Sequence, residues 1–403
     1  MNRNDRSIVG LAMVAHGMVH TYELSIPILM TIWLDTFQVS PGQLGLVVSI
    51  GYALFGLGAI PGGVLADVYG SRRLIALALF GMGSSFVILA LAPSVPAIAL
   101  GLIVWGAAAS VYHPSGLSLI SKGVTQRGDA FAYHGMAGNL GIALGPLATT
   151  VLLLFAGWNL VSGLLAIPAL AAAVYATRLR FDETAAVADG DGDTREDSVR
   201  SLSAFVAESR TLLLSPFLAV VTIMMLSGLY YRGFLTFLPE LLSSFPMFAP
   251  IEVAGRALEP SRYFYSTLLV IGMAGQYVGG KLTDRIPTER GLAIGYISLA
   301  VLAVLFLPTA TLGPLPLLVV GGVLGFFLFM VQPLYQATVA EYTPSGTRGL
   351  SYGYTYLGAF GIGAAGAAIA GGIIQFFDAT ALFLVLATFA VLAATLAGYL
   401  MRR

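Results

Sequence analysis

The chain has 403 residues, of which 57% are hydrophobic and only 10% charged, and its mean hydropathy is +0.86. A soluble protein carries roughly a quarter charged residues, so this composition excludes a soluble enzyme and a disordered chain. Lys and Arg (20) balance Asp and Glu (20), which excludes a nucleic-acid binder with a basic face. The absence of cysteine excludes disulfides and thiolate metal sites. The composition therefore predicts a polytopic membrane protein.

Twelve apolar segments are long enough to cross a bilayer as helices, since a spanning helix needs about 20 residues. Ala, Leu and Gly dominate these segments, and they lack the short alternating pattern of a membrane β-strand. We therefore predict an all-α polytopic membrane protein. The predicted spans are 8–34, 42–66, 74–92, 96–121, 129–155, 158–177, 215–241, 263–283, 291–308, 315–340, 350–376 and 379–400.

The basic residues indicate how the chain is oriented. With a cytoplasmic N-terminus, seventeen of the twenty Lys and Arg residues fall on the cytoplasmic side, as the positive-inside rule requires. We expect both termini in the cytoplasm and the protein in the plasma membrane. The polar, acidic stretch 178–210 is interpreted as a flexible cytoplasmic linker. It separates an N-terminal six-helix bundle (1–177) from a C-terminal six-helix bundle (211–403).

The two halves repeat one another in sequence. The pattern Gly-x-x-x-Asp occurs at 63–67 after the second span and at 280–284 after the eighth, an offset of 217 residues. A Gly and a Pro eight residues apart recur in spans 4 and 10, at Gly106 and Pro114 and at Gly325 and Pro333. Such a repeat of six plus six helices places a substrate site between the halves, near the bilayer midplane.

These features resemble the major facilitator superfamily over essentially the whole chain. Residues 63–72, which read Gly-x-x-x-Asp-x-x-Gly-x-Arg, are similar to its signature between spans 2 and 3. Val68 and Ser71 stand where the family usually has basic residues. A solvated loop turn is the alternative reading of this segment. The resemblance implies a twelve-helix transporter whose cytoplasmic gate involves Asp67, Arg72 and Arg73, with the second copy at Asp284 and Arg285.

Two shorter patterns bear on the direction of transport. Gly141-x-x-x-Gly145-Pro146 in span 5 resembles a motif of antiporter members of the superfamily. Small residues permit close helix contact and proline bends a helix, although ordinary glycine packing would give the same pattern. The segment 112–115 (Tyr-His-Pro-Ser) is similar to the fosmidomycin-resistance-type drug exporters. Both resemblances favour efflux.

Ionisable residues inside the membrane are the best candidates for function, because burying a charge there costs about 2.5–3.5 kcal/mol on insertion scales. Glu23 lies fifteen residues into the first span. His16, His20 and Glu23 share one helical stripe, so we expect Glu23 to bind the coupling proton beside His20 and His16. Zinc binding competes, but no metalloprotease signature is present, and no metal is predicted. Hydrogen bonding between helices is the stronger alternative for the histidines.

A polar set in later spans predicts the substrate cavity. His113 precedes Pro114, and its repeat counterpart Gln332 precedes Pro333. Arg232 is a cation inside span 7. We expect it either to pair with Glu23 as a gate or to bind an anion, because its planar guanidinium donates two parallel hydrogen bonds. His134, at the start of span 5, is not assigned to the site. The predicted cavity residues are His113, Arg232, Asn139, Gln332, Tyr335 and Gln336.

We predict a secondary active transporter that exchanges a small molecule, anionic or drug-like, for protons by alternating access. A proton-coupled symporter or a uniporter of an organic anion is the alternative. The zinc-hydrolase motif His-Glu-x-x-His and the ATP-binding Gly-Lys-Ser/Thr loop are missing from the sequence, so neither an enzyme nor an ATP-driven pump is expected. The expected partners are the small molecule, protons and membrane lipid, without nucleic acid or a cofactor, and the chain is expected to be monomeric.

Overall fold

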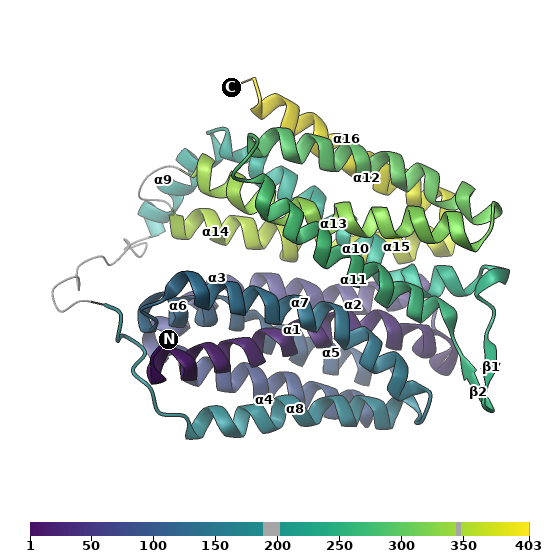
Figure 1. Ribbon diagram of the computed structural model, residues 1–403, viewed down its shortest axis with the longest axis horizontal. Helices are drawn as coiled ribbons and strands as arrows, with labels where there is room; N and C mark the ends of the chain where they lie inside the picture. Colours follow the sequence, from purple (N-terminus) through teal and green to yellow (C-terminus); the bar gives the residue numbers. More distant parts are fainter. Residues whose placement is uncertain (188–201, 344–347, 403) are drawn as a thin grey trace. The chain divides into compact units, whose positions relative to one another are not determined.

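The computed structural model describes residues 1–187, 202–343 and 348–402 (Figure 1). The described chain folds as two compact units, each with its own buried core. The first unit comprises Met1–Val39, Val47–Asp193 and Ile251–Leu258, and the second comprises Ser40–Leu46, Thr194–Pro250 and Glu259–Arg403. The predicted bundles were 1–177 and 211–403, so two short segments, 40–46 and 251–258, group with the opposite half.

Residues 1–187 of the described chain form eight helices. They are α1 (Arg3–Phe37), α2 (Pro41–Leu57), α3 (Ala59–Tyr69), α4 (Ser71–Ala90), α5 (Val95–Ser110), α6 (Tyr112–Gly123), α7 (Arg127–Leu153) and α8 (Trp158–Arg178). The second predicted span is thus divided into α2 and α3, and the fourth into α5 and α6. The hairpin of β1 (Ile251–Val253) and β2 (Arg256–Leu258) also belongs to the first unit. Its turn residues Ala254 and Gly255 both have positive φ, which suits the right-handed twist of the two strands.

The second half contains the remaining elements. They are α9 (Leu202–Leu213), α10 (Phe217–Ser243), the 3-10 turn η1 (Pro246–Phe248), α11 (Pro260–Leu282), α12 (Thr288–Thr311), α13 (Pro314–Tyr342), α14 (Arg348–Tyr356), the π-helix η2 (Leu357–Ile362), α15 (Ala365–Phe376) and α16 (Ala379–Leu400). Helix α9 was not predicted. It lies partly within the proposed linker, and it buries Ser209 and Leu212 while Val206 is exposed.

The helices fit the predicted membrane spans. Nine predicted spans coincide with described helical segments that are long and apolar enough to cross a membrane, and the other three predicted spans correspond to α1, to α2 with α3, and to α11. The largest difference is at the first span, which begins at Arg3 because Asn2 caps the helix by accepting a hydrogen bond from the Asp5 amide. The predicted all-α polytopic fold is confirmed. Nine segments of the described chain are long and apolar enough to cross a membrane: Ser71–Ala90, Val95–Gly123, Arg127–Leu153, Trp158–Arg178, Phe217–Ser243, Thr288–Thr311, Pro314–Tyr342, Leu350–Phe376 and Ala379–Leu400.

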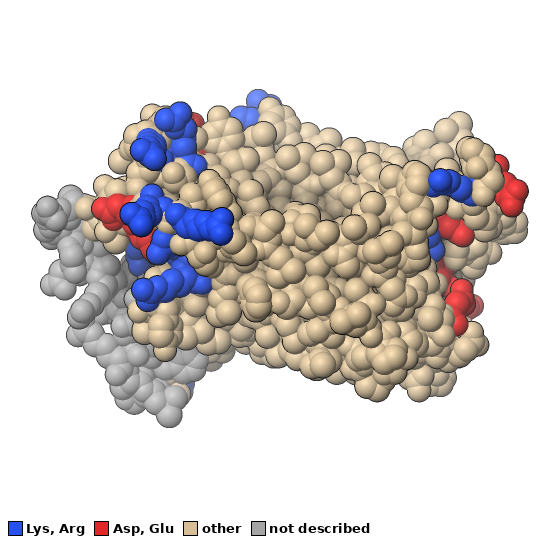
Figure 2. Space-filling view, turned by 90° about the horizontal axis from the view of Figure 1, so that it is seen from below, with Lys and Arg blue, Asp and Glu red and all other residues tan. Residues whose placement is uncertain are grey.

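Charged side chains are distributed as a membrane protein requires. In the view of Figure 2, most Lys and Arg residues gather at one end of the molecule, and the broad surface beside them carries neither acidic nor basic side chains. Large apolar side chains of the first unit are exposed, among them Leu77 and Phe80 on α4 and Leu164 on α8. Such a surface is stable in contact with lipid, which needs no polar cover.

Helices α1 and α7 approach each other through glycine. A methyl group on Gly141 would lie 2.3 Å from the carbonyl oxygen of Gly17, and one on Gly145 would lie 2.6 Å from the Cα of Thr21. Both distances are shorter than any real contact of a Cβ atom, so only glycine permits this spacing. The backbones therefore touch directly along the face of α1 that carries His16 and His20.

A π-helix interrupts span 11. Helix α14 passes into η2 before α15 begins, and π-turns of this kind are often found at functional sites. The segment packs on α10, where a methyl group on Gly228 would lie 2.1 Å from the carbonyl oxygen of Ala359. Gly228 is therefore required for the close packing of α10 against η2.

Candidate functional site

The stripe predicted on α1 forms a chain of hydrogen bonds. Glu23 is buried, with 1% of its surface exposed. His20 Nδ1 lies 2.5 Å from the carboxylate Oε2 of Glu23, and His20 Nε2 lies 3.1 Å from His16 Nε2. The helical spacings of three and four residues bring these side chains together, as predicted. The described structure thus links the two imidazoles to the buried carboxylate.

Helix α7 continues this chain. His16 Nδ1 lies 2.7 Å from the backbone carbonyl oxygen of His134, and the two imidazole rings stack with centroids 3.9 Å apart and planes inclined by 13°. The ring of His16 fits over Gly138, where a methyl group would lie 2.4 Å from its Cε1 atom. His134 was not assigned to the site from the sequence, yet it is the residue through which α7 holds His16.

Helix α6 supplies the rest of the group. The ring centroid of His113 lies 5.2 Å from that of His16 and 5.7 Å from that of His20. The hydroxyl of the neighbouring Tyr112 donates a hydrogen bond to the Ala12 carbonyl and lies 3.1 Å from His134 Nε2. All four histidines of the protein therefore lie together, and we call His16, His20, His113 and His134 the histidine cluster.

Proline in α1 exposes part of the backbone at Glu23. Pro27 has no N–H, so it cannot donate the helical hydrogen bond to the carbonyl oxygen of Glu23, four residues earlier. The hydroxyl of Tyr52 on α2 donates to this oxygen instead, at 3.1 Å. Helix α2 therefore contacts the backbone of Glu23, while α6 and α7 surround the histidines.

The histidine cluster has the composition of a transition-metal site. One ligand atom from each of His16, His20 and His113 lies within 4.8 Å of the others, and imidazole nitrogens suit zinc, copper or nickel. However, the Nε2 atoms of His16 and His20 are hydrogen-bonded to each other. The same pair of nitrogens is therefore also close enough to share a hydrogen.

The other predicted cavity residues are divided between the units. Asn139 lies half-buried on α7 in the first unit, whereas Arg232 lies on α10 in the second and is only 3% exposed. The guanidinium carbon of Arg232 is 5.5 Å from the centroid of the Tyr231 ring, within the range of a cation–π contact. On α13, Gln332 and Tyr335 are half-buried and Gln336 is exposed.

The predicted gate motif borders a segment that follows α8. Gly70 has a φ of 85°, which glycine adopts without strain and which ends α3 before α4 begins. Arg72 Nη1 donates to the carbonyl oxygen of Leu179. The carboxylate of Glu183 accepts hydrogen bonds from the backbone amides of Ser71, at 2.8 Å, and Arg72, at 3.4 Å. Glu183 thus caps the positive N-terminus of α4.

The same segment is held by further hydrogen bonds. Asn4 Nδ2 donates to the carbonyl oxygens of Gly123 and Asp182, each at 3.0 Å, and the amide of Ala186 donates to Lys122. The pKa of Asp182 is lowered because the amide and hydroxyl of Thr184 donate to its carboxylate. Residues 179–187 are therefore fixed on the first unit, although the sequence predicted a flexible linker beginning at 178.

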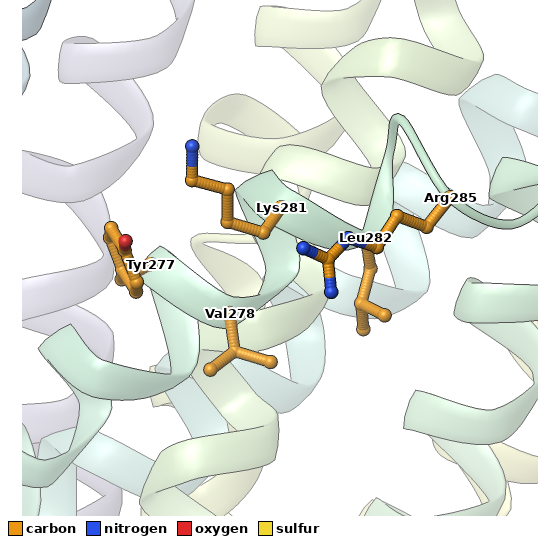
Figure 3. A pocket seen from close by; sticks show the side chains of 5 residues that line it. All are labelled: Tyr277, Val278, Lys281, Leu282 and Arg285. Atoms are coloured by element: carbon orange, nitrogen blue, oxygen red, sulfur yellow. The ribbon is translucent and has the colours of Figure 1, made fainter.

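Three of the other predicted gate residues lie on the surface. Arg73, Asp284 and Arg285 are exposed, and the side chain of Asp67 lies outside the described part of the structure, although its backbone belongs to α3. Figure 3 shows Lys281, in the last turn of α11, and Arg285, which follows the helix, at a pocket. The pocket is lined by Tyr277, Val278, Lys281, Leu282 and Arg285.

Three residues that the sequence did not point to contact these groups. His134 and Tyr112 lie at the histidine cluster, and Glu183 lies at the start of α4. A signal for His134 was present, because His134, Gly138, Gly141 and Gly145 recur at intervals of three and four and so share one face of α7. Tyr112 directly precedes the predicted His113. Nothing local marked Glu183, because its role depends on where the chain returns after α8.

The fold and the buried polar groups define a polytopic helical membrane transporter. The chain matches the Major Facilitator Superfamily over residues 9–365 and again over 266–403. It therefore belongs to this superfamily, and it is a transporter rather than an enzyme.

Comparison with curated proteins finds a resemblance to the puromycin resistance protein pur8 of Streptomyces alboniger. The two are 32% identical over 101 residues, which is 24% of this chain. The match spans only about a fifth (20%) of that relative. The likeness is therefore confined to one segment of both proteins.

Solved transporter structures share the whole fold. The nucleoside transporter NupG has a TM-score of 0.79 at 13% identity, covering 98% of this chain and 99% of its own. A bacterial homolog of the human lysosomal transporter Spinster has a TM-score of 0.78 at 16% identity, with 100% and 98% covered. The xylose transporter XylE from E. coli has a TM-score of 0.74 at 16% identity, with 98% and 96% covered. At such identities the likeness shows the fold alone.

Proposed function

We propose that this transporter exports a small drug-like molecule in exchange for protons, with Glu23 as the coupling carboxylate. The observation that carries the proposal is the hydrogen bond between Glu23 and His20 in α1, which contains the first predicted membrane span. A carboxyl group changes its charge by taking up or releasing a proton, and burial favours its neutral, protonated form. His20 and His16 extend the proton site along α1.

Export is supported by two independent features. The partial relative is named for puromycin resistance, which makes puromycin the first substrate to test, with fosmidomycin as the second. The Gly141, Gly145 and Pro146 motif lies on α7 against α1, so that a conformational change in α7 would reach the helix that carries Glu23. His113 and Asn139, together with Gln332, Tyr335 and Gln336, are proposed to contribute to the substrate cavity.

The proposal also covers the location and orientation of the protein and its cytoplasmic gate. The bias of Lys and Arg supports both termini in the cytoplasm, and the protein is proposed to be a monomer in the plasma membrane. On that side, Arg72, anchored to the segment after α8, supports a gate at the start of α4. Asp67 and Arg73 are assigned to the same gate, and Asp284 and Arg285 to its repeat copy.

The test uses proteoliposomes with an internal pH indicator and compares wild type with Glu23→Gln. Adding substrate should move protons in the wild type, and the direction of proton flux relative to substrate distinguishes exchange from cotransport. Glu23→Gln should abolish proton movement while still binding substrate. Glu252→Gln, which changes an exposed carboxylate on the hairpin, is the matched control. Unchanged coupling in Glu23→Gln would reject the role of Glu23.

A second candidate function is proton-coupled symport or uniport of an organic anion. It is favoured by Arg232, a cation that is only 3% exposed within α10, because a planar guanidinium binds carboxylates through paired hydrogen bonds. Arg232→Lys should then weaken binding of an organic anion at least tenfold, about 1.4 kcal/mol. The exposed Arg256→Lys should have no effect. Equal binding by both variants would exclude Arg232 from anion recognition.

A further inference from the structure

The hydrogen bonds of the α1 stripe can be given a direction. His16 Nδ1 lies 2.7 Å from the backbone carbonyl oxygen of His134. A carbonyl oxygen only accepts, so Nδ1 of His16 must carry a hydrogen. This fixes one end of the chain without reference to any pKa. If His16 is neutral, its Nε2 atom is then an acceptor.

The next two contacts each contain one hydrogen. His16 Nε2 and His20 Nε2 are 3.1 Å apart, and two nitrogens at this distance attract each other only when one donates to the other. His20 Nδ1 and Glu23 Oε2 are 2.5 Å apart and likewise share a hydrogen. The three contacts together therefore hold three hydrogens.

Ionised Glu23 and two neutral imidazoles would supply only two hydrogens, because each neutral imidazole carries one and a carboxylate carries none. The observed contacts thus contain one proton more. It can reside on the carboxyl of Glu23, on the ring of His20 or on the ring of His16, and in every case the three side chains have a net charge of zero. A neutral group is the form that burial favours.

We propose that Glu23, His20 and His16 hold one coupling proton in common, and that its release separates the rings of His16 and His20. The proposal rests on the proposed proton coupling. It adds that the contact between the two rings depends on whether the shared proton is present. His16 is then a proton carrier and not only a neighbour of the site. The structure describes the loaded state.

The separation follows from the same count. After release, ionised Glu23 keeps the Nδ1 hydrogen of His20, and the His134 carbonyl keeps the Nδ1 hydrogen of His16. Both Nε2 atoms then direct lone pairs at each other across 3.1 Å, which is repulsive. His16 is held by stacking on His134 and by its hydrogen bond to α7, so His20, whose side chain is 14% exposed, is the ring that moves.

The groups facing these three side chains come from every neighbouring helix. Helix α6 contributes His113 and Tyr112, and α7 contributes His134. Helix α2 contributes Tyr52, whose hydroxyl binds the Glu23 carbonyl. Helices α4 and α8 contact α1 at Tyr22, through the Phe86 ring and the Leu165 carbonyl. The imidazole of His113, 5.7 Å from His20 between ring centroids, is the titratable neighbour that must be monitored in a pH experiment.

Glutamine at position 23 makes a sharp test possible. Its amide NH₂ can donate to Nδ1 of a neutral His20, whose Nε2 hydrogen then donates to His16. This arrangement satisfies all three contacts without an additional proton. Glu23→Gln should therefore keep the His16 and His20 rings together at every pH, whereas the wild type should lose their contact as the pH rises.

The contact is measured by NMR on protein labelled with ¹⁵N-histidine in nanodiscs, in the presence of a metal chelator. The readout is the coupling between the two Nε2 nuclei through their shared hydrogen, assigned with His16→Asn and His20→Asn and followed across the range where histidine titrates. In the wild type the coupling should be present at low pH and absent at high pH, and Glu252→Gln should behave identically. In Glu23→Gln it should persist throughout.

A coupling that survives at high pH in the wild type would overturn the proposal, and this result needs no variant to fold. Loss of the coupling at the same pH in Glu23→Gln and wild type would also overturn it, because the proton would then belong to the imidazoles alone. The transport assay separates the two proposals. If the coupling responds as expected but no substrate moves protons, the proposed function fails while the shared proton stands.

Discussion

The carbonyl oxygen of Glu23 accepts a hydrogen bond from the side chain of Tyr52, which lies on another helix. The cause is Pro27, which has no N–H at the position where the helix would supply one. Inside a membrane an unsatisfied carbonyl has no water to turn to. Tyr52 is 1% exposed, so its hydroxyl is a buried donor that replaces the missing backbone N–H at the proposed proton site.

Tyr52→Phe should therefore destabilise the protein by about 1–3 kcal/mol, the cost of leaving a buried polar group unpaired. Thermal unfolding in detergent measures the effect. Adding Pro27→Ala restores an amide donor at residue 27 and should recover part of the loss. If Tyr52→Phe melts like the wild type, or if Pro27→Ala does not improve it, the carbonyl has another donor.

Gly141→Ala should separate α1 from α7, because the new methyl group would lie 2.3 Å from the Gly17 carbonyl oxygen. Overpacking of this kind costs about 1–3 kcal/mol, and the transport rate should fall with it. Gly135→Ala is the control on the same helix, since a methyl group there meets nothing within 4 Å. The comparison uses melting temperature and transport rate, and equal behaviour of the two variants would contradict the close contact.

Tyr112→Phe removes a hydroxyl that bonds to the Ala12 carbonyl and to His134 Nε2. The expected loss of stability is about 1–3 kcal/mol, because both partners are buried. The ¹⁵N signals of His134 should shift at the same time. Tyr175→Phe, on α8 with 60% of its surface exposed, should change neither the melting temperature nor the histidine signals. An unshifted His134 would show that its Nε2 is bonded elsewhere.

Glu183→Gln weakens the cap on α4. A charged group at a helix N-terminus contributes about 0.3–1 kcal/mol, so a small decrease in melting temperature is expected, and it should shrink in high salt. The substitution should also loosen the segment around Leu179, which Arg72 contacts, with faster amide exchange of Ser71 and Arg72. The exposed Glu252→Gln should leave these amides unchanged. Protection equal to that of the wild type would remove Glu183 from the cap.

Gly228→Ala tests the π-helix of span 11. The added methyl group would lie 2.1 Å from the Ala359 carbonyl oxygen, so η2 must shift, at a cost of about 1–3 kcal/mol. Gly398→Ala, on α16 in the same unit, places its methyl group in open space. Transport and melting temperature should fall for Gly228→Ala alone. A tolerated substitution would show that η2 adjusts without penalty.

The sequence predicts most of the fold, because the length and apolarity of a span are local properties. Breaks inside spans are harder to predict. The division of span 2 at Gly58 and the π-helix at Leu357–Ile362 depend on contacts with neighbouring helices, such as that between Gly228 and Ala359. Helix α9 was missed because a short polar helix has no membrane signal.

The sequence also predicts the part of the candidate site that lies on one helix, because spacing along a helix is a local property. His16, His20 and Glu23 lie on a single helix, so their spacing alone brings them together. His134 and Tyr112 lie on other helices, and their contact with His16 depends on how α6 and α7 are rotated about their axes. That rotation is set by the glycines of α7, whose packing partners cannot be identified from one sequence.

The glycine contact between α1 and α7 also determines how these helices can move. Backbone meets backbone at Gly17 with Gly141 and at Thr21 with Gly145, so neither helix can slide along the other without first separating from it. Each helix carries a proline next to this contact, Pro27 in α1 and Pro146 in α7, where the chain is free to bend. We therefore expect both helices to bend at their prolines, while the joined segment and the proposed proton site beside it stay together.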